Sequence, residues 1–226
     1  MQTADFPLLE LQAAGYHAVA LGQKTYNGVA VLSRLEHGAP TDVRPGMDDG
    51  DPDPEARLIT AHIPGLGLRV ASAYVPNGQT IDCDKYAYKL RWLRRFREYL
   101  QRHHRADEVL VVGGDYNIAP SDIDVYDPEG WHDSVICHVD ARAALSDIMA
   151  LGLHDALRHM EPTAKIFSYW DYRQLAFPKN QGLRIDHLLC TQPLIARCIA
   201  ARVDRDARKG EKPSDHAPVL ATFRRA

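Results

Sequence analysis

The sequence predicts a mixed α/β sandwich, and three observations lead to this fold class. Short runs rich in β-branched and apolar residues recur along the chain and predict strands. A few segments place apolar residues at steps of three and four, which predicts helices. Several gaps between the predicted strands are too short for a crossover helix, so a simple doubly wound sheet fits less well.

The predicted elements follow one another along the chain without a repeat or a low-complexity linker. Strands are predicted at residues 29–32, 58–63, 68–74, 109–112, 188–190 and 219–223. The strand at 109–112 shows no alternation, which is typical of a strand buried on both faces. Helices are predicted at residues 8–14, 85–103 and 140–151. The helix at 85–103 gathers its apolar side chains on one face: Tyr86, Leu90, Leu93, Phe96 and Leu100.

Length and composition exclude some classes of protein. The 226 residues favour one domain, residues 1–226, over two. The formal net charge of −3 is not that of a strongly basic nucleic-acid-binding tail, although an enzyme with a local basic rim is compatible with it. The four cysteines lack C-x-x-C spacing, which argues against a zinc ribbon and for reduced thiols: Cys83, Cys137, Cys190 and Cys198. No leader or membrane-spanning stretch is recognisable, so we expect a cytoplasmic protein.

Polar side chains gather where predicted strands begin or end, which is where loops place functional groups on a rigid frame. The candidates share this position: Tyr74, Asp115, Asn117, Asp186, Asp215 and His216. Asp and Asn offer the hard oxygen ligands that suit Mg²⁺. An Asp–His pair can polarise an imidazole, and a tyrosine hydroxyl can donate to a phosphate oxygen. Together these groups suit metal-assisted attack of water on a phosphodiester.

Each candidate also has a structural interpretation. Asp115 and Asn117 are common turn residues, and Asp186 can form an ion pair with Arg184. Asp215 can cap a loop, and a single histidine is more often a strand-edge residue than a ligand. The combination of residues, rather than any one of them, indicates a catalytic site.

Five blocks of sequence resemble the exonuclease III family, the apurinic/apyrimidinic endonuclease branch of the endonuclease/exonuclease/phosphatase superfamily. They are residues 22–30 (GQKTYNGVA), 113–118 (GGDYNI), 167–173 (FSYWDYR), 182–189 (GLRIDHLL) and 212–219 (KPSDHAPV). The likeness runs in order from about residue 6 to residue 225. The blocks at 167–173 and 182–189 point to this branch rather than to the wider superfamily.

The resemblance implies a four-layered α/β sandwich of two packed mixed sheets flanked by helices. It also implies a Mg²⁺-dependent enzyme, or one using Mn²⁺, that acts on double-stranded DNA at abasic sites and 3′ ends. The oligomeric state is open from the sequence, with a monomer as the default expectation. By this resemblance the catalytic residues are Tyr74, Asp115, Asn117, Asp186 and His216. The implied metal ligands are Asp115, Asn117, Asp215 and His216.

The resemblance assigns a role to each of these residues. Asp115 would take the proton of the attacking water, and Asn117 would help hold that water. Tyr74 and His216 would contact the phosphate, Asp186 would support the leaving oxygen or the phosphate network, and Asp215 would orient His216 or bind metal.

A pocket for an extruded deoxyribose is also implied, with Tyr169, Trp170 and Leu183 as its wall. For Trp170 the alternative is a core aromatic residue.

The family opens with a strand, a helix and a second strand that ends in Q-E, and this opening supplies an Asn and a Glu as metal ligands. The present sequence resembles the family only after that opening, so we expect an N-terminally incomplete sandwich. Either the natural chain starts upstream of Met1, which we favour because every downstream block is intact, or the protein is a truncated relative. A chain that starts at Met1 should bind metal weakly, have poor activity and expose a sheet edge.

Two other functions remain open from the sequence. One is a phosphoesterase of the same superfamily that acts on a nucleotide or a lipid head group. The other is a DNA-binding remnant whose catalysis is weakened by the missing ligands.

Overall fold

The computed structural model describes residues 1–51 and 53–225. Its centre is a six-stranded mixed sheet with the strand order β3-β4-β5-β6-β8-β7. The strands are β3 (Thr41–Pro45), β4 (Leu58–Ile63), β5 (Leu68–Tyr74), β6 (Leu110–Asp115), β8 (Asp186–Thr191) and β7 (Leu153–Asp155). β5 and β6 pair in parallel, whereas the other neighbours are antiparallel. This mixed pairing confirms the predicted fold class.

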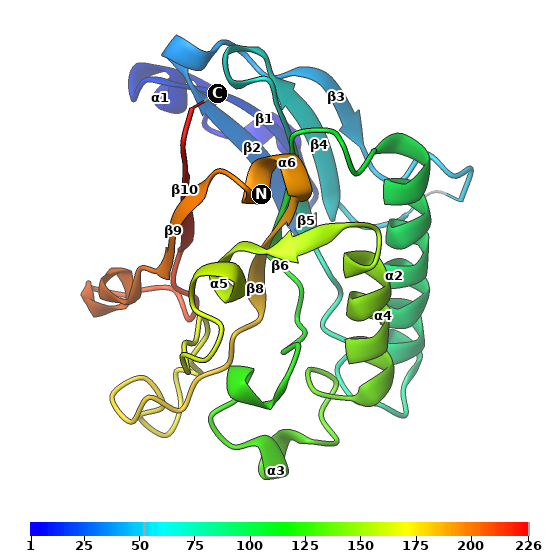
Figure 1. Ribbon diagram of the computed structural model, residues 1–226, viewed down its shortest axis with the longest axis vertical. Helices are drawn as coiled ribbons and strands as arrows, with labels where there is room; N and C mark the ends of the chain where they lie inside the picture. The colour runs from blue at the N-terminus through cyan, green and yellow to red at the C-terminus, as the bar shows by residue number, and fades with distance from the viewer. Residues whose placement is uncertain (52, 226) are drawn as a thin grey trace.

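One face of this sheet is covered by α2 (Asp84–His103) and α4 (Val139–Met149), which lie side by side in Figure 1. The predicted apolar stripe of α2 explains this packing, because Leu93 and Phe96 enter the main core. There they meet strand residues such as Ala71, Val112 and Leu189, which point to the helical side of the sheet.

The opposite face is covered by two separate antiparallel ladders. One pairs β1 (Tyr16–Gly22) with β2 (Gly28–Arg34), and the other pairs β9 (Cys198–Val203) with β10 (Val219–Phe223). Val29 and Val31 of the first ladder pack against Ile59 and Ala61 of β4. Within residues 1–51 and 53–225, this layer is therefore two ladders rather than one continuous sheet. We call the face of the central sheet that they cover the ladder face.

Four shorter helices complete the described elements. They are α1 (Leu8–Ala13), α3 (Pro128–Trp131), α5 (Ala156–Met160) and α6 (Gln192–Ile195). α1 lies against β1, and α5 and α6 pack with β8 and β9 at the side of the sandwich (Figure 1). Across the described residues, no helix combines the length and the apolar character needed to cross a bilayer.

The predicted strands at 58–63, 68–74 and 219–223 are confirmed with the same bounds. β8 begins at Asp186, two residues before the prediction, and β6 extends to Asp115. Both candidate carboxylates therefore belong to strands rather than to the loops beside them. Strand pairing fixes their positions more firmly than a loop would.

Candidate active site

The pairing register of the central sheet places three candidate side chains next to one another. Tyr74 at the end of β5 pairs with Asp115 of β6, and Asp115 pairs in turn with Asp186 of β8. Val111 lies an even number of residues before Asp115, and it packs on the ladder face, as Leu188 does in β8. Tyr74, Asp115 and Asp186 consequently form a row on the ladder face of the sheet.

Gly114 allows β6, which bears Asp115, to run close beside β5. Its φ of 151° favours glycine, and a Cβ atom at this position would collide with the carbonyl oxygen of Ala73. The second glycine of the GGDYN block is thus explained by the close approach of β5 and β6.

His216 reaches the row from the loop that precedes β10. Its Nδ1 lies 2.8 Å from Oδ2 of Asp186, and its ring packs against that of Tyr169 with centroids 5.0 Å apart. The backbone of Asp186 is itself held by Ser168, whose Oγ accepts from its N–H at 3.1 Å. The carboxylate that contacts His216 is therefore Asp186, and Asp215 makes no side-chain hydrogen bond to it within the described residues.

The charges around His216 favour its protonated form. Burial alone would lower the pKa of His216, but the hydrogen bond and charge of Asp186, with the charges of Asp115 and Asp215, raise it to about 9. Among the described residues, its Nε2 atom has no protein hydrogen-bond partner. The imidazolium can therefore donate from Nε2 to a ligand.

Asp115 is oriented by Asn117, two residues further on. The Asn117 backbone N–H donates to Oδ1 of Asp115 at 2.8 Å, and Nδ2 of Asn117 donates to Oδ2 at 3.1 Å. Nδ2 also donates to the Val75 carbonyl, while Oδ1 of Asn117 accepts from Nδ2 of Asn77 at 3.0 Å. Both ends of the Asn117 amide are thus engaged, which fixes the side chain in one orientation.

The carboxyl group of Asp115 has an unusual proton affinity. Burial raises its pKa, and the facing charge of Asp186 raises it further, against the opposing charge of His216. The pKa of the Tyr74 hydroxyl is also raised, by burial and by the charge of Asp115. Three carboxylates, those of Asp115, Asp186 and Asp215, face the single imidazolium of His216, so the site favours an added positive charge.

Ligand atoms of Asp115, Asp186 and His216 lie within 4.8 Å of one another, which is close enough to share one metal ion. The two facing carboxylates suit Mg²⁺, because hard oxygen donors are its preferred ligands and a divalent cation relieves their repulsion. A cavity of about 470 Å³ opens beside these three residues and is walled by Leu188 and Pro218. The donor set present therefore fits a divalent cation.

The three residues predicted to bind sugar differ in their exposure. Tyr169 is half-buried beside His216, whereas Trp170 and Leu183 are each only 1% exposed. Trp170 packs in a small cluster with Phe167 and Ala217. The predicted pocket wall stays a prediction, and for Trp170 and Leu183 it requires movement to expose their surface.

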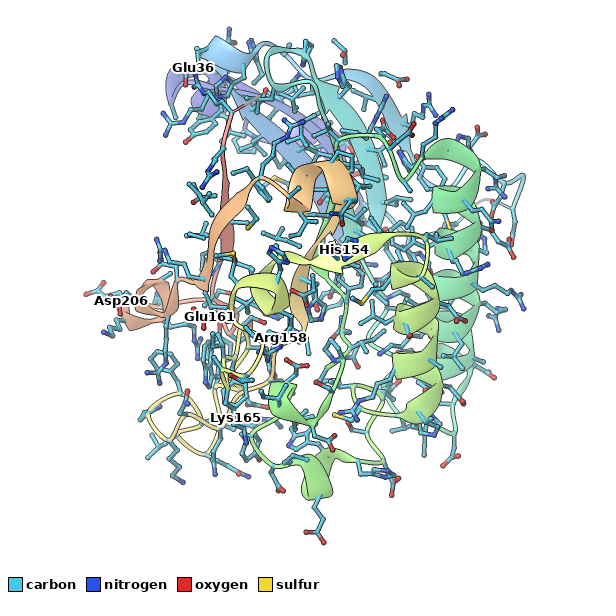
Figure 2. All side chains as sticks on the ribbon, viewed as in Figure 1. Glu36, His154, Arg158, Glu161, Lys165 and Asp206 are labelled. Atoms are coloured by element: carbon cyan, nitrogen blue, oxygen red, sulfur yellow. The ribbon has the colours of Figure 1, made fainter. Side chains whose placement is uncertain are left out.

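A second group of charges lies buried behind the row. Arg184 bonds Oδ1 of Asp124 at 2.6 Å and Oδ2 of Asp155 at 2.5 Å, so Asp186 is not its ion-pair partner. Arg158 also bonds Asp124, and it donates to the Ala164 carbonyl at 2.7 Å. Figure 2 labels Arg158, a residue of α5, near Glu161. We call Asp124, Asp155, Arg184 and His187 the buried ion cluster.

Sequence reasoning missed Asn77, Lys89 and the buried ion cluster. Asn77 follows the end of β5 in the segment VPNG, where its position after a strand was the available signal. Lys89 falls inside the apolar stripe of α2, three residues after Tyr86 and four before Leu93. A charged residue at such a position indicates a buried polar contact.

Comparisons with known proteins agree with this geometry. The model of the endonuclease/exonuclease/phosphatase family matches residues 2–216. Exodeoxyribonuclease III of Haemophilus influenzae is 35% identical over 230 residues, covering 97% of this chain and 85% of that protein.

Two solved structures resemble the chain over 99% of its length and 85% of theirs. An AP endonuclease from Archaeoglobus fulgidus has a TM-score of 0.93 at 42% identity. A 3′ phosphatase from Neisseria, bound to product DNA hairpin, has a TM-score of 0.93 at 40% identity.

Proposed function

The chain belongs to the endonuclease/exonuclease/phosphatase family, and from this premise we propose that it is a metal-dependent DNA phosphodiesterase of the exodeoxyribonuclease III and abasic-site endonuclease kind. It is a hydrolase that serves DNA repair. Its substrate is double-stranded DNA, which it cleaves at abasic sites and from which it removes nucleotides at 3′ ends.

One observation carries this proposal: four polar groups from distant parts of the chain meet on the ladder face. Register sets Tyr74, Asp115 and Asp186 side by side, and the 2.8 Å contact brings His216 to Asp186. A phosphodiester above this row meets a base, an imidazolium and a phenol within one cleft. Attack of water on phosphorus needs these groups.

Asp115 accepts the proton of the attacking water at its carboxylate. A base works best when its pKa lies near the working pH, and burial next to Asp186 moves the pKa of Asp115 in that direction. The two hydrogen bonds from Asn117 aim the carboxylate, so its orientation needs no change during the reaction.

His216 and Tyr74 bind the phosphate. Asp186 holds Nδ1 of His216, which leaves the Nε2 proton to donate to a non-bridging oxygen. The Tyr74 hydroxyl stays protonated at neutral pH, because burial raises its pKa, and it donates a second hydrogen bond. These two donors stabilise the charge that grows on the phosphate oxygens.

The family is metal-dependent. The sequence predicts Asp115, Asn117, Asp215 and His216 as ligands of the cation, and the distances between ligand atoms add Asp186. We assign the cation to the oxygen ligands among these, because a protonated His216 has no free lone pair and serves the phosphate instead. A bound Mg²⁺ or Mn²⁺ would supply positive charge that stabilises the phosphoryl oxygens during attack.

The remaining assignments concern the substrate and the state of the protein. Tyr169, Trp170 and Leu183 form the wall that receives an extruded deoxyribose. The protein is a monomer with one domain over residues 1–226, and its four free thiols support a cytoplasmic location.

A nicking assay tests the proposal. The purified chain is incubated with Mg²⁺ and a duplex that carries one abasic site, and products are separated by size. Cleavage that disappears in Asp115→Ala and after chelation of the metal supports the proposal. An intact oligonucleotide combined with release of phosphate from a nucleotide or lipid head group would support the alternative phosphoesterase.

Removal of a 3′ phosphate is a second activity to test, because the neighbour from Neisseria is a 3′ phosphatase. A duplex with a recessed 3′ phosphate reports it directly. Binding of duplex DNA without any cleavage, at every metal concentration, would instead identify a DNA-binding remnant.

A further inference from the structure

Lys89 is a fully buried lysine in the middle of α2, with 0% of its surface exposed. Its Nζ donates to three backbone carbonyls: Asn77 at 3.1 Å, Asn117 at 2.7 Å and Val135 at 2.7 Å. An ammonium group has three protons, so all of its donors are used. None of these acceptors is a carboxylate, so the ammonium form is held by carbonyl dipoles alone, and burial lowers the pKa of Lys89 to about 7.

The three carbonyls belong to segments that are far apart in the chain. Asn77 follows β5, Asn117 follows β6 and Val135 precedes α4. Burial of an ammonium group without a carboxylate partner is unfavourable, and an apolar residue would suit this position in the stripe. Unlike an apolar residue, Lys89 fixes these three segments relative to one another through its hydrogen bonds.

The hydrogen bond from Lys89 to the Asn117 carbonyl affects the proposed reaction, because Asn117 orients the Asp115 carboxylate. Asn117 has a φ of 49°, in the left-handed region that a residue with a side chain rarely adopts. Its N–H is held by Asp115 at 2.8 Å and its carbonyl by Lys89 at 2.7 Å. Lys89 and Asp115 thus hold the two sides of one strained residue, whose amide in turn aims Asp115.

We propose that Lys89 is a positioning residue for the reaction: it fixes the backbone of Asn117 and thereby the direction of the Asp115 carboxylate. The inference rests on the proposed function, in which Asp115 is the base. Lys89 touches neither substrate nor reacting atoms, and it acts only through Asn117 and the neighbouring Asn77.

The test replaces Lys89 with methionine, which keeps the shape and removes the donors. The matched control is Tyr99→Phe, on the same helix, which removes a buried hydrogen bond of 3.1 Å to Thr60 of β4. Rates on abasic duplex are measured at a temperature where each variant is folded, and they are divided by the folded fraction. Loss of a positioning contact should lower kcat about 10- to 100-fold with KM nearly unchanged, as for other partners that orient catalytic ligands.

The outcomes are distinct. Lys89→Met with wild-type kcat per folded molecule, or a similar kcat loss in Tyr99→Phe, would overturn the proposal. Should Lys89→Met not fold, Lys89→Gln replaces it, because its shorter amide reaches fewer carbonyls and should lower kcat in the same way. A further measurement uses the wild-type chain without any substitution. NMR couplings across the hydrogen bond should link the Lys89 ammonium to the Asn117 carbonyl. The absence of such couplings refutes the contact.

A further NMR measurement separates this proposal from the proposed function. The side-chain amide signals of Asn117 should shift in Lys89→Met and stay in place in Tyr99→Phe. A wild-type chain without any phosphodiesterase activity would refute the proposed function, and the Asn117 signals would still decide whether Lys89 positions that residue.

Discussion

Two histidine–carboxylate contacts lie on opposite faces of β8, and they have opposite characters. Asp186 faces the ladders, where Nδ1 of His216 lies 2.8 Å from its Oδ2. His187, the next residue, faces the helices, where its Nδ1 lies 3.7 Å from Oδ2 of Asp155. Neighbouring positions in one strand thus present the same pair of residue types to different surroundings.

The surroundings decide the charge on each ring. Burial lowers the pKa of His187, and the charge of Arg184 lowers it further, so this ring is neutral. It accepts from Arg184 at 2.9 Å and donates to the Ile118 carbonyl at 2.9 Å, which settles its tautomer. His216 faces three carboxylates and no arginine, so its pKa rises and it carries a charge.

The comparison shows how one sheet separates stability from chemistry. Together with Arg158, which also bonds Asp124, the buried ion cluster matches two guanidinium groups with two carboxylates, and its own four residues have almost no exposed surface. The row of Tyr74, Asp115 and Asp186 keeps unbalanced negative charge beside an open cavity. A cluster whose charges balance needs no further ion, whereas excess negative charge favours a bound cation, and the cation with the His216 imidazolium then favours a phosphate.

The largest expected effect is that of Asp115→Asn on activity. Removal of the base should lower kcat about 10²–10⁴-fold. Folding stability should not fall, because the amide ends the repulsion with Asp186 that raises the pKa of Asp115. Nicking rates and thermal unfolding measure the two effects, with the exposed Asp140→Asn as a control. A variant that loses stability and activity together would contradict the assigned role.

Arg184→Met should have the next largest effect, on stability. It leaves Asp155 buried without its cation and Asp124 with Arg158 alone, and breaking such a buried pair costs about 3–5 kcal/mol. Chemical denaturation at pH 7 measures the loss, and Arg105→Met, in an exposed ion pair with Asp107, is the control that should unfold as the wild type does. An Arg184→Met chain as stable as the wild type would show that the buried ion cluster does not stabilise the fold.

This stability also depends on pH with a defined sign. Burial alone would raise the pKa values of Asp124 and Asp155, but the charge of Arg184 holds both below their ordinary value of 3.8. The contribution of these carboxylates is therefore complete above that value and is lost as the pH falls below it. The difference between wild type and Arg184→Met should shrink in acid.

His216→Gln is expected to have a smaller effect on catalysis than Asp115→Asn. Loss of one donor to the developing charge should lower kcat about 10²-fold. His187→Asn should instead reduce stability and keep kcat per folded molecule, because its ring lies on the helical side of the sheet, against Tyr116, the buried ion cluster and the Ile118 carbonyl. Steady-state kinetics of both variants, corrected for folded fraction, test the comparison. Equal losses of kcat would mean that the two rings do not have separate functions.

Much of the fold follows from local patterns, and the site follows only in part. The strands at 68–74 and 219–223 were predictable because apolar and β-branched residues fill them. The beginning of β8 was not, because Asp186 and His187 have low strand propensity, and their place depends on pairing with β6. β3 and β7 likewise depend on their neighbours in the sheet.

Two features of the site could not be predicted from sequence patterns. The row of Tyr74, Asp115 and Asp186 requires the register of three strands that are far apart in the chain, which no local pattern specifies. Lys89 was visible as a charge in an apolar stripe, but its acceptors are carbonyls of three separate loops. Backbone acceptors have no signature in the sequence.

The smallest effect is spectroscopic, and it tests the comparison most directly. In the wild-type chain without metal, the ring signals of His216 should titrate at about 9, because Asp186, Asp115 and Asp215 favour its charge. The pKa of His187 is lowered, so its signals should show no titration as the pH rises from 6.5. For His216 the sign follows from a folded pKa above the unfolded one: its stabilisation is complete below pH 6.5 and is lost as the pH rises through about 9. Proton NMR from pH 6 to 10, assigned with His216→Gln and His187→Asn, measures both rings. If both titrate together near 6.5, the carboxylates of the row do not act on His216, and the site does not differ in charge from the buried ion cluster behind it.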